Sequence, residues 1–557
     1  MLEHTAKLAK DAEPARETGR RGWWRGRAAW GVGLVVAAIV LSWLYTLQSR
    51  TQAANSDGAG IALQGWDMLH GNLLLRGWWA ADVSFYTFEV PLDALVIAAR
   101  GLSADVVHVA AGIEYALLVL AAALLARGTA RGREGVCRAV LAAGIMIAPG
   151  LGEGTRVLLG SPAHIGVGVP ILLTLLLVDR AREHWLVPVA VCVLLVWAQL
   201  DDPMAEYAAA LPLVLVGLVR AGVSLYRFRR DASRRRAWRY DAGLAVAAAV
   251  SYELTQIAIH VIRAAGGFSM RSLSSATATI PASQWGDQLV RTGRDALLLF
   301  GADFYWQSGT LAKAIAILHL VGAALAVAGL LAGILGLVRG GDRVTQALTA
   351  GTILALGAAA LENPMLPGYG AHEIAVVLPF AAVLAGRAVG PWLLRTGLPR
   401  LARASLAVVL GVVAVGYLAV VGYSAAQPPM AAPTQALAGF LAEHGLTSGL
   451  GKYWAANLTT AVSGERVRVL PAQPPTKPYA WLTKPSWYNA DQNSANFVVA
   501  GDPVTSSTYP VSTVLAAFGK PAREYRFDGY VIMVYDRNLL HDMKRPVQPN
   551  PDLGSRL

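Results

Sequence analysis

Carboxylates and aromatic side chains are concentrated in one polar stretch near the start of the chain, residues 55–89. It contains Asp57, Asp67, Asp82 and Glu89, together with several Trp, Tyr and Phe residues. The stretch directly follows an apolar run and is itself too polar to cross a bilayer. A carboxylate held beside a membrane can act as a general base toward a hydroxyl group. The stretch therefore predicts the reactive loop of a membrane enzyme.

Asp57 is the main candidate for the catalytic carboxylate. It lies in NSDGAG, where the adjacent Gly58 permits close approach of the backbone to a ligand. An Asp immediately before a helix is also a typical N-cap. The two roles are compatible, because a helix N-terminus keeps a carboxylate ionised. Both a cap and a general base remain open for Asp57.

Three further residues of this loop are candidate substrate-binding residues. Arg76 follows a segment with partial helical periodicity, residues 60–75, which we expect to lie in the membrane interface. Asp82 and Glu89 bracket aromatic residues, and either could pair with Asp57 or bind substrate hydroxyls. The alternative for the charged groups of the interfacial helix is a solvated helix face.

Later external segments supply four more candidate substrate-binding residues. Asp202 lies in LDDPMAEY, where three acids could bind a divalent cation through hard oxygens or favour a helix N-terminus. His164, His372 and Glu373 lie at external ends of apolar runs, where they could contact a phosphate or a sugar, or cap a helix. We expect no metal site and no cofactor.

The composition indicates a membrane protein with many spans. Of the 557 residues, 55% are hydrophobic and 15% are charged, against roughly 45–50% and about 25% in soluble domains. Many apolar runs approach the ~20 residues needed to span a bilayer. We predict about eleven spans between residues 29 and 424.

The formal charge of +12 comes from short basic runs between the apolar segments, such as RRGWWRGR and YRFRRDASRRRAWR. Short loops rich in Lys and Arg mark the cytoplasmic side of a membrane, whereas nucleic-acid binding would need a basic face on a folded domain. We therefore predict a multi-pass protein of the cytoplasmic membrane that binds no nucleic acid. Its N-terminus is expected in the cytoplasm, and the loop 48–103 and the C-terminal region outside.

Three regions are expected along the chain. Residues 1–28 are charged and predicted to be disordered in the cytoplasm. Residues 29–424 form an all-α polytopic membrane domain. Residues 425–557 alternate helix-like and short strand-like runs separated by Pro, Gly and Asn, which predicts a small extracytoplasmic α/β domain.

This layout resembles the GT-C class of membrane glycosyltransferases, which includes protein O-mannosyltransferases and aminoarabinose transferases. The resemblance is carried by the first span, by NSDGAGIALQGWDMLHGNLLL after it, and by the C-terminal domain. A second stretch, GYGAHEIAVVLPFAAVLAGR at residues 368–387, resembles the family segment in which an Arg-Tyr pair precedes a Leu-rich helix. His372 and Glu373 occupy the position of that pair, and a single acid, Asp57, replaces the paired acids common in the class.

The resemblance implies an enzyme that moves a sugar from a polyprenyl-phosphate donor to an envelope glycan, lipid or protein on the outer face of the membrane. The composition, rich in Ala, Gly, Arg and Leu, is like that of bacterial proteins from high-GC genomes. Asp57 would be the general base. Two alternatives remain open, namely a transporter or flippase of lipid-linked precursors and a non-catalytic protein of envelope assembly. Transporters often show paired repeats with polar groups near the midplane, and no convincing repeat is present here.

Overall fold

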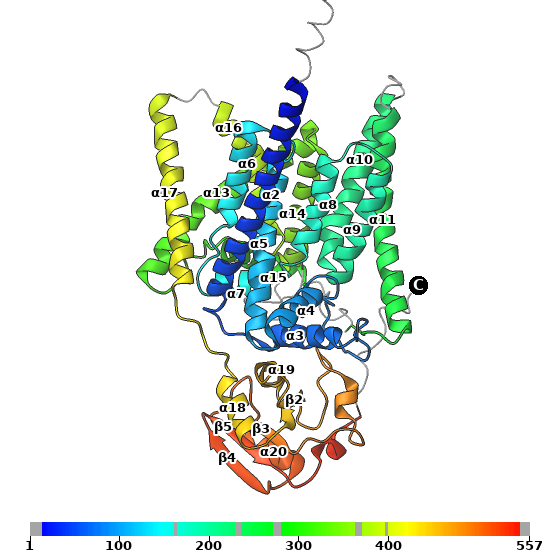
Figure 1. The fold of residues 1–557 in the computed structure, drawn as a ribbon, viewed down its shortest axis with the longest axis vertical. Helices are drawn as coiled ribbons and strands as arrows, with labels where there is room; N and C mark the ends of the chain where they lie inside the picture. The colour runs from blue at the N-terminus through cyan, green and yellow to red at the C-terminus, as the bar shows by residue number, and fades with distance from the viewer. Residues whose placement is uncertain are drawn as a thin grey trace, which may run out of the picture.

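A helical bundle with a smaller α/β unit at one end makes up the molecule (Figure 1). The computed structural model describes residues 14–160, 164–228, 235–270, 280–361, 370–395 and 399–545. The predicted fold class, an all-α polytopic membrane protein with a small C-terminal α/β domain, is confirmed.

Long apolar helices form the bundle, because a backbone in hydrocarbon must satisfy its hydrogen bonds within the segment. Across the described ranges, eight helices are long and apolar enough to cross a membrane. They belong to α2 (Pro14–Ser49), α5 (Asp105–Arg127), α10 (Leu211–Phe228, continuous with the π-helix η1, Glu206–Ala210), α11 (Arg235–Ala264), α13 (Thr310–Arg339), α14 (Arg343–Leu361), α16 (Val377–Arg395) and α17 (Arg400–Ala425). Three shorter helices lie in the same bundle: α6 (Gly132–Met146), α8 (Gly168–Arg180) and α9 (Leu186–Asp201).

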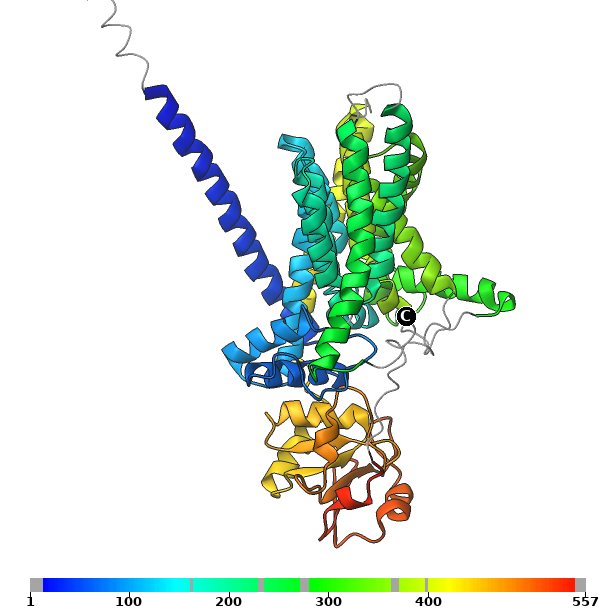
Figure 2. The ribbon, with the colours of Figure 1, turned by 90° about the vertical axis from the view of Figure 1, so that its right-hand side faces the viewer.

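The start of α2 corrects the prediction for residues 1–28. This segment was expected to be disordered, yet helix α2 already begins at Pro14, while residues 1–13 lie outside the described part. Extending an existing helix adds one hydrogen bond for each residue that is fixed, and Ala and Arg are good helix formers. The helix of the first span therefore continues through the basic stretch. Figure 2 shows this end of α2 leaning away from the bundle.

Short helices cover one end of the bundle (Figure 1). The first loop contributes α3 (Ser56–Leu69) and α4 (Glu89–Arg100), and later loops contribute α7 (Glu153–Leu159), η4 (Ala282–Gln284), α12 (Trp285–Leu299) and α15 (Gly370–Glu373). Helices α3 and α4 lie across the bundle end rather than along its axis (Figure 2).

The C-terminal unit is built on a five-stranded sheet of order β2-β1-β3-β5-β4. Its elements are α18 (Gln435–Glu443), β1 (Ser448–Gly451), α19 (Tyr453–Val462), β2 (Arg468–Pro471), η5 (Pro485–Tyr488), β3 (Phe497–Gly501), α20 (Val511–Phe518), β4 (Arg523–Phe527), β5 (Tyr530–Val534) and η6 (Leu539–Asp542). Strand β1 runs parallel to β2 and β3, whereas β5 is antiparallel to β3 and β4. The two-residue turn Asp528-Gly529 has positive φ at both positions, which suits the right-handed twist of a β-hairpin.

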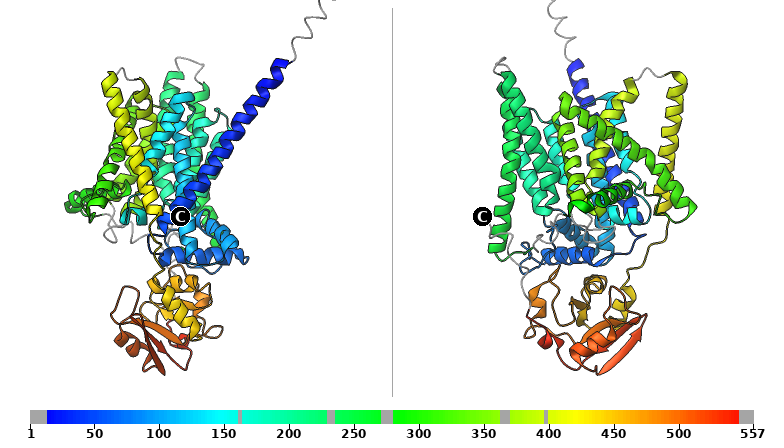
Figure 3. Two further views of the ribbon diagram at one scale, coloured as in Figure 1. Left: turned by 60° about the vertical axis from the view of Figure 1, so that its left-hand side comes forward. Right: turned by 180° about the vertical axis from the view of Figure 1, so that it is seen from behind.

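The first loop and the C-terminal unit share one apolar core. Leu63 and Trp78 of the loop pack in a buried cluster with Leu458 and Leu482 of the C-terminal unit. Helix α19 therefore lies directly against α3, and the sheet lies beyond it (Figures 1 and 3). This packing holds C-terminal side chains against the loop that carries Asp57.

Candidate functional site

Helix α3 places Asp57 in its first turn. Asn55 caps the helix, and its Oδ1 accepts the backbone N–H of Gly58 at 2.8 Å. The sequence left open whether Asp57 is only an N-cap. Asn55 fills that role, so the carboxylate of Asp57 is available for another one.

The Asp57 carboxylate faces the C-terminal unit. Its Oδ1 accepts hydrogen bonds from the hydroxyl of Tyr453 on α19 and, at 3.2 Å, from Nε1 of Trp481. No described residue donates a hydrogen bond to Oδ2. Burial raises the pKa of Asp57, the two hydrogen bonds oppose that rise, and the negative charge of Asp82 adds to it. One oxygen is thus held in place and the other is free to accept a proton.

A second group of side chains, which we call the acidic cluster, comprises Asp82, His164, Asp202 and Glu373. His164 Nδ1 lies 2.6 Å from Asp202 Oδ2, and Asp202 Oδ1 accepts the backbone N–H of Met204 at 2.8 Å. The segment after Asp202 enters the π-helix η1, a rare conformation frequent at functional sites. From η1, the Tyr207 hydroxyl donates to the Glu373 carbonyl oxygen at 3.2 Å.

The electrostatics of the acidic cluster favour a charged imidazole. Burial alone lowers the pKa of His164, but the negative charges of Asp202, Glu373 and Asp82 outweigh it and raise that pKa to about 10. Burial raises the pKa of Asp82 and of Glu373, and the charge of His164 opposes both rises. No described residue bonds to the second ring nitrogen, Nε2. This N–H can therefore donate to a ligand.

Asp82 acts electrostatically on both groups. Its charge acts on Asp57 and also on His164, so it lies near both. The structure therefore brings together five of the residues predicted from the sequence, from four separate segments of the chain.

Glu89 lies close by but is closed off from solvent. It is the first residue of α4 and is only 1% exposed. An added Cβ at Gly166 would collide with Glu89 Oε1, so the Gly166 backbone packs directly on this carboxyl group. Burial, together with the charge of Asp201, raises the pKa of Glu89 well above its usual value. This environment favours a neutral carboxyl group that supports the loop.

Two other predicted residues, Arg76 and His372, are not members of the acidic cluster. Arg76 is exposed in the turn after α3, where its backbone N–H donates to Asn72 Oδ1 at 2.6 Å. His372 precedes Glu373 on α15. Their roles as substrate contacts remain predictions. Within the described residues, no group of three or more His, Cys, Asp or Glu side chains is arranged to hold a metal ion.

Sequence reasoning missed Tyr453, Trp481 and Tyr207. The first two lie 396 and 424 residues beyond Asp57, and no local pattern in the sequence indicates such a contact. Tyr207 follows the acids of LDDPMAEY directly, but its hydrogen bond to Glu373 joins positions 166 residues apart.

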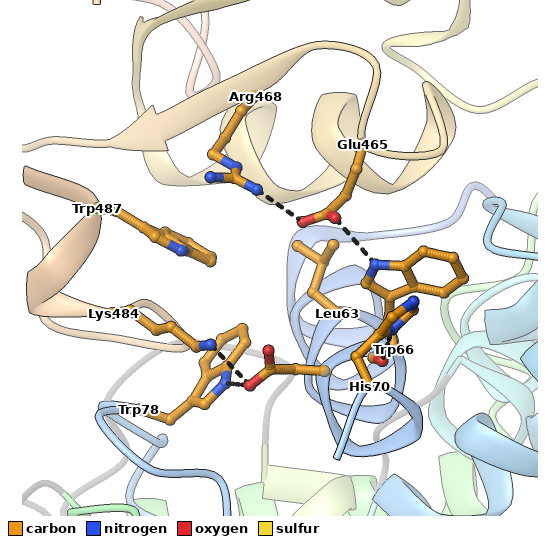
Figure 4. Close-up of a pocket in the computed structure, with 9 residues that line it drawn as sticks. Leu63, Trp66, His70, Trp78, Glu465, Arg468, Lys484 and Trp487 are labelled. Carbon is orange, nitrogen blue, oxygen red and sulfur yellow. Dashed lines mark hydrogen bonds and ion pairs between the residues drawn. The ribbon is translucent and has the colours of Figure 1, made fainter. Parts of the chain in front are cut away.

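A second polar region lies at the other end of α3. A cavity of about 280 Å³ opens between this helix and the C-terminal unit, and both sides contribute aromatic and charged side chains (Figure 4). Its lining residues are Leu63, Trp66, Asp67, His70, Trp78, Glu465, Arg468, Lys484 and Trp487.

Comparisons with known proteins identify the fold. No protein-family model matches the chain, and no curated protein matches it. Among solved structures, apo ArnT from Cupriavidus metallidurans is similar at a TM-score of 0.51 and 15% identity, over 93% of this chain and 99% of that one. Two further similar structures are the oligosaccharyltransferase AglB from Archaeoglobus fulgidus (TM-score 0.45, 12% identity, 85% and 70% coverage) and the arabinofuranosyltransferase AftD from Mycobacteria (TM-score 0.38, 15% identity, 90% and 40% coverage). The likeness to ArnT spans nearly the whole of both chains, and the chain therefore has the GT-C fold that its sequence predicts.

Proposed function

We propose that this protein is a glycosyltransferase that moves a sugar from a polyprenyl-phosphate donor to an acceptor in the cell envelope. The reaction would take place at the outer face of the cytoplasmic membrane. A shared fold does not specify a reaction, so the proposal rests on the site. One observation carries it: helix α3, which bears Asp57, and helix α15, which bears Glu373 of the acidic cluster, lie at the same end of the bundle (Figure 1), and the charge of Asp82 raises the pKa of both Asp57 and His164.

Each group has a role in this reaction. Asp57 Oδ2 takes the proton from an acceptor hydroxyl, whose oxygen then attacks the anomeric carbon of the donor sugar. The bond from that carbon to the phosphate oxygen breaks, and its electron pair leaves with the polyprenyl phosphate. The Nε2–H of a protonated His164 donates a charge-assisted hydrogen bond to the departing phosphate.

The carboxylates of the acidic cluster have a different task. Asp82 and Glu373 can accept hydrogen bonds from sugar hydroxyls. Three carboxylates around one imidazolium also give the cluster a negative field, which stabilises positive charge that develops on the sugar ring in the transition state. The same field repels a donor with two phosphate groups more strongly than a polyprenyl monophosphate, which carries fewer negative charges.

Transfer by the purified protein tests the proposal. The full chain in lipid nanodiscs is supplied with undecaprenyl phosphate carrying a radiolabelled sugar and with a cell-envelope fraction as acceptor. We expect label in the acceptor together with release of free undecaprenyl phosphate. A parallel assay in sealed vesicles measures whether the donor crosses the bilayer intact. Movement of the intact donor without release of undecaprenyl phosphate would contradict the proposal and identify a transporter.

A further inference from the structure

The cavity between α3 and the C-terminal unit has the features of a site for a sugar ring. We propose that it binds a neutral sugar residue of the acceptor, at a distance from the reacting hydroxyl. The binding of a neutral sugar is argued from the geometry of the cavity alone, whereas the assignment of that sugar to the acceptor rests on the proposed function.

The lining combines flat rings with paired charges. In Figure 4, Trp66 and Trp487 lie on opposite sides of the cavity, and Leu63 lies between them. Arg468 pairs with Glu465 at 3.3 Å on one side, and Lys484 lies near Trp78 on the other. A sugar ring has apolar C–H faces and a rim of hydroxyl groups. The indole rings can pack against the C–H faces, and the adjacent charged side chains can hydrogen-bond to the hydroxyl groups.

The aromatic rings are held in place before any ligand binds. The Trp66 indole N–H donates to Glu465 Oε2 at 2.9 Å, and the Trp78 indole N–H donates to Asp67 Oδ2 at 2.8 Å. A cation also lies over the ring of Trp78 and over that of Trp487. Lys484 Nζ is 5.3 Å from the ring centre of Trp78, and the Arg468 guanidinium carbon is 5.7 Å from the ring centre of Trp487. A site whose side chains are fixed in advance loses less entropy when it binds.

The charges of the cavity select a neutral ligand. Lys484 pairs with Asp67 at 2.7 Å, and Arg468 pairs with Glu465, so two cations meet two anions. The formal charges cancel, and neither a phosphate nor an ammonium group finds an unpaired counterion. Hydroxyl groups can still bond to these side chains, since a carboxylate accepts several hydrogen bonds. The volume of about 280 Å³ is just under the ~300 Å³ at which sites for drug-sized ligands begin, and it suits a single ring.

The position of the cavity relative to Asp57 points to the acceptor. Leu63, Trp66, Asp67 and His70 follow the spacing of one helix face. Asp57, at the start of α3, also contacts the C-terminal unit, through Tyr453 and Trp481. Ten residues separate Asp57 from Asp67, which corresponds to ~15 Å along a helix. The C-terminal unit lies on the side of α3 away from the bundle (Figure 1), and residues of both line the cavity. An acceptor glycan could thus occupy the cavity with one residue while another presents its hydroxyl to Asp57.

Binding measurements on the full chain in nanodiscs test this inference. The probes are neutral methyl hexosides and methyl pentosides at millimolar concentration, with glucuronic acid and glucosamine as charged counterparts, and binding is followed by saturation-transfer NMR. We expect at least one neutral probe to bind better than both charged ones. In Trp66→Ala and Glu465→Ala, the affinity should fall roughly tenfold or more, because the first variant removes a ring face and the second removes the hydrogen-bond acceptor that holds this ring.

Two controls separate the cavity from other sites. Trp285→Ala removes an exposed indole on α12, outside the cavity, and should bind as the wild type does. Asp57→Asn should also bind normally, even if it abolishes transfer. Failure of every neutral probe to bind, or unchanged binding by Trp66→Ala, would overturn the inference, as would equal loss in Asp57→Asn. Absence of transfer activity with intact binding would instead count against the proposed function alone.

Discussion

His164 Nδ1 lies 2.6 Å from Asp202 Oδ2, which joins two segments that are 38 residues apart in the sequence. The side chain of Asp202 is 3% exposed and that of His164 is 20% exposed. A nearly buried carboxylate is costly unless it is paired. The imidazolium of His164 and the backbone N–H of Met204 supply that pairing, and with it they fix the geometry of the acidic cluster.

This pair predicts a pH-dependent loss of stability. The pKa of His164 in the folded protein, about 10, lies above its ordinary value of about 6.5. The stabilisation from its charge is therefore complete below about pH 6.5 and is lost as the pH rises toward about 10. The melting temperature of the wild type should exceed that of His164→Gln most at the acidic end of this range. The difference between the two proteins, measured by intrinsic fluorescence, should shrink steadily as the pH rises. A constant difference would show that His164 is neutral in the folded protein.

The hydroxyl of Tyr453 should tune the basicity of Asp57. This hydrogen bond lowers the pKa of Asp57 and opposes the effect of burial. In Tyr453→Phe the donor is absent, so the pKa of Asp57 rises further. If the ionised carboxylate is the base, the acid limb of the profile of kcat/KM against pH should move to higher pH. The maximal rate well above that limb should change much less. An unshifted limb in Tyr453→Phe would separate Asp57 from the proton transfer.

Gly60 should be essential for docking of the C-terminal unit on the first loop. A Cβ at this position would lie 2.7 Å from Leu482 Cδ1 and 2.8 Å from Leu482 Cβ. Gly60→Val therefore overpacks the shared core, at a cost of about 1–3 kcal/mol. We expect a lower melting temperature and faster proteolytic release of the C-terminal unit.

Gly439→Ala on α18 is the matched control for Gly60→Val. Nothing lies within 4 Å of a Cβ at Gly439, and Ala is a better helix former than Gly by about 1 kcal/mol. This variant should therefore be as stable as the wild type or more so. Release of the C-terminal unit at equal rates from both variants would contradict the docking role of Gly60.

The distribution of arginine predicts the orientation in the membrane. At the end of the bundle opposite the C-terminal unit, Arg343 pairs with Asp241 and Glu183, and Arg387 pairs with Asp179 and Asp342. Basic residues favour the cytoplasmic side, which places the C-terminal unit outside. In a variant in which Cys137 and Cys192 are replaced, a membrane-impermeant maleimide added to intact cells should label Gln492→Cys and spare Arg182→Cys. The reverse pattern would place the candidate site in the cytoplasm.

The helices could be predicted from the sequence because each apolar run must hydrogen-bond internally in a bilayer. The interfacial segment expected at residues 60–75 forms helix α3, which spans Ser56–Leu69. Helices α7 and α12 were missed. Helix α7 has only seven residues. Helix α12 mixes apolar and charged residues and is too short and too polar to span a membrane.

The candidate site could be predicted only in part. The acids and histidines of the loops could be identified individually from their place beside apolar runs. Their partners were not, because the contact of Asp57 with Tyr453 and that of Trp66 with Glu465 each join positions about 400 residues apart. Such contacts depend on how the C-terminal unit packs on α3, which leaves no local periodicity in either segment.

Replacement of the Asp57 carboxylate gives the most direct test of the mechanism. In Asp57→Asn the amide oxygen can still accept the hydrogen bonds of Tyr453 and Trp481, so the fold should be retained. The proton acceptor is lost, and sugar transfer should fall by about 10²- to 10⁴-fold, as is typical for a general base. Binding of the polyprenyl-phosphate donor should change little, since this carboxylate serves the acceptor. Transfer and donor binding are measured on the same nanodisc preparation.

Asn55→Ala provides the contrast, because it removes the cap of α3 and leaves Asp57 in place. Loss of an N-cap typically costs about 1 kcal/mol of stability, so this variant should melt at a lower temperature and still transfer sugar when folded. The two substitutions lie two residues apart and should have opposite effects, with Asp57→Asn stable and inactive and Asn55→Ala less stable and active. If Asp57→Asn transfers sugar at nearly the wild-type rate, Asp57 is not the base. Asp82 would then be the next residue to test, because its charge acts on both Asp57 and His164.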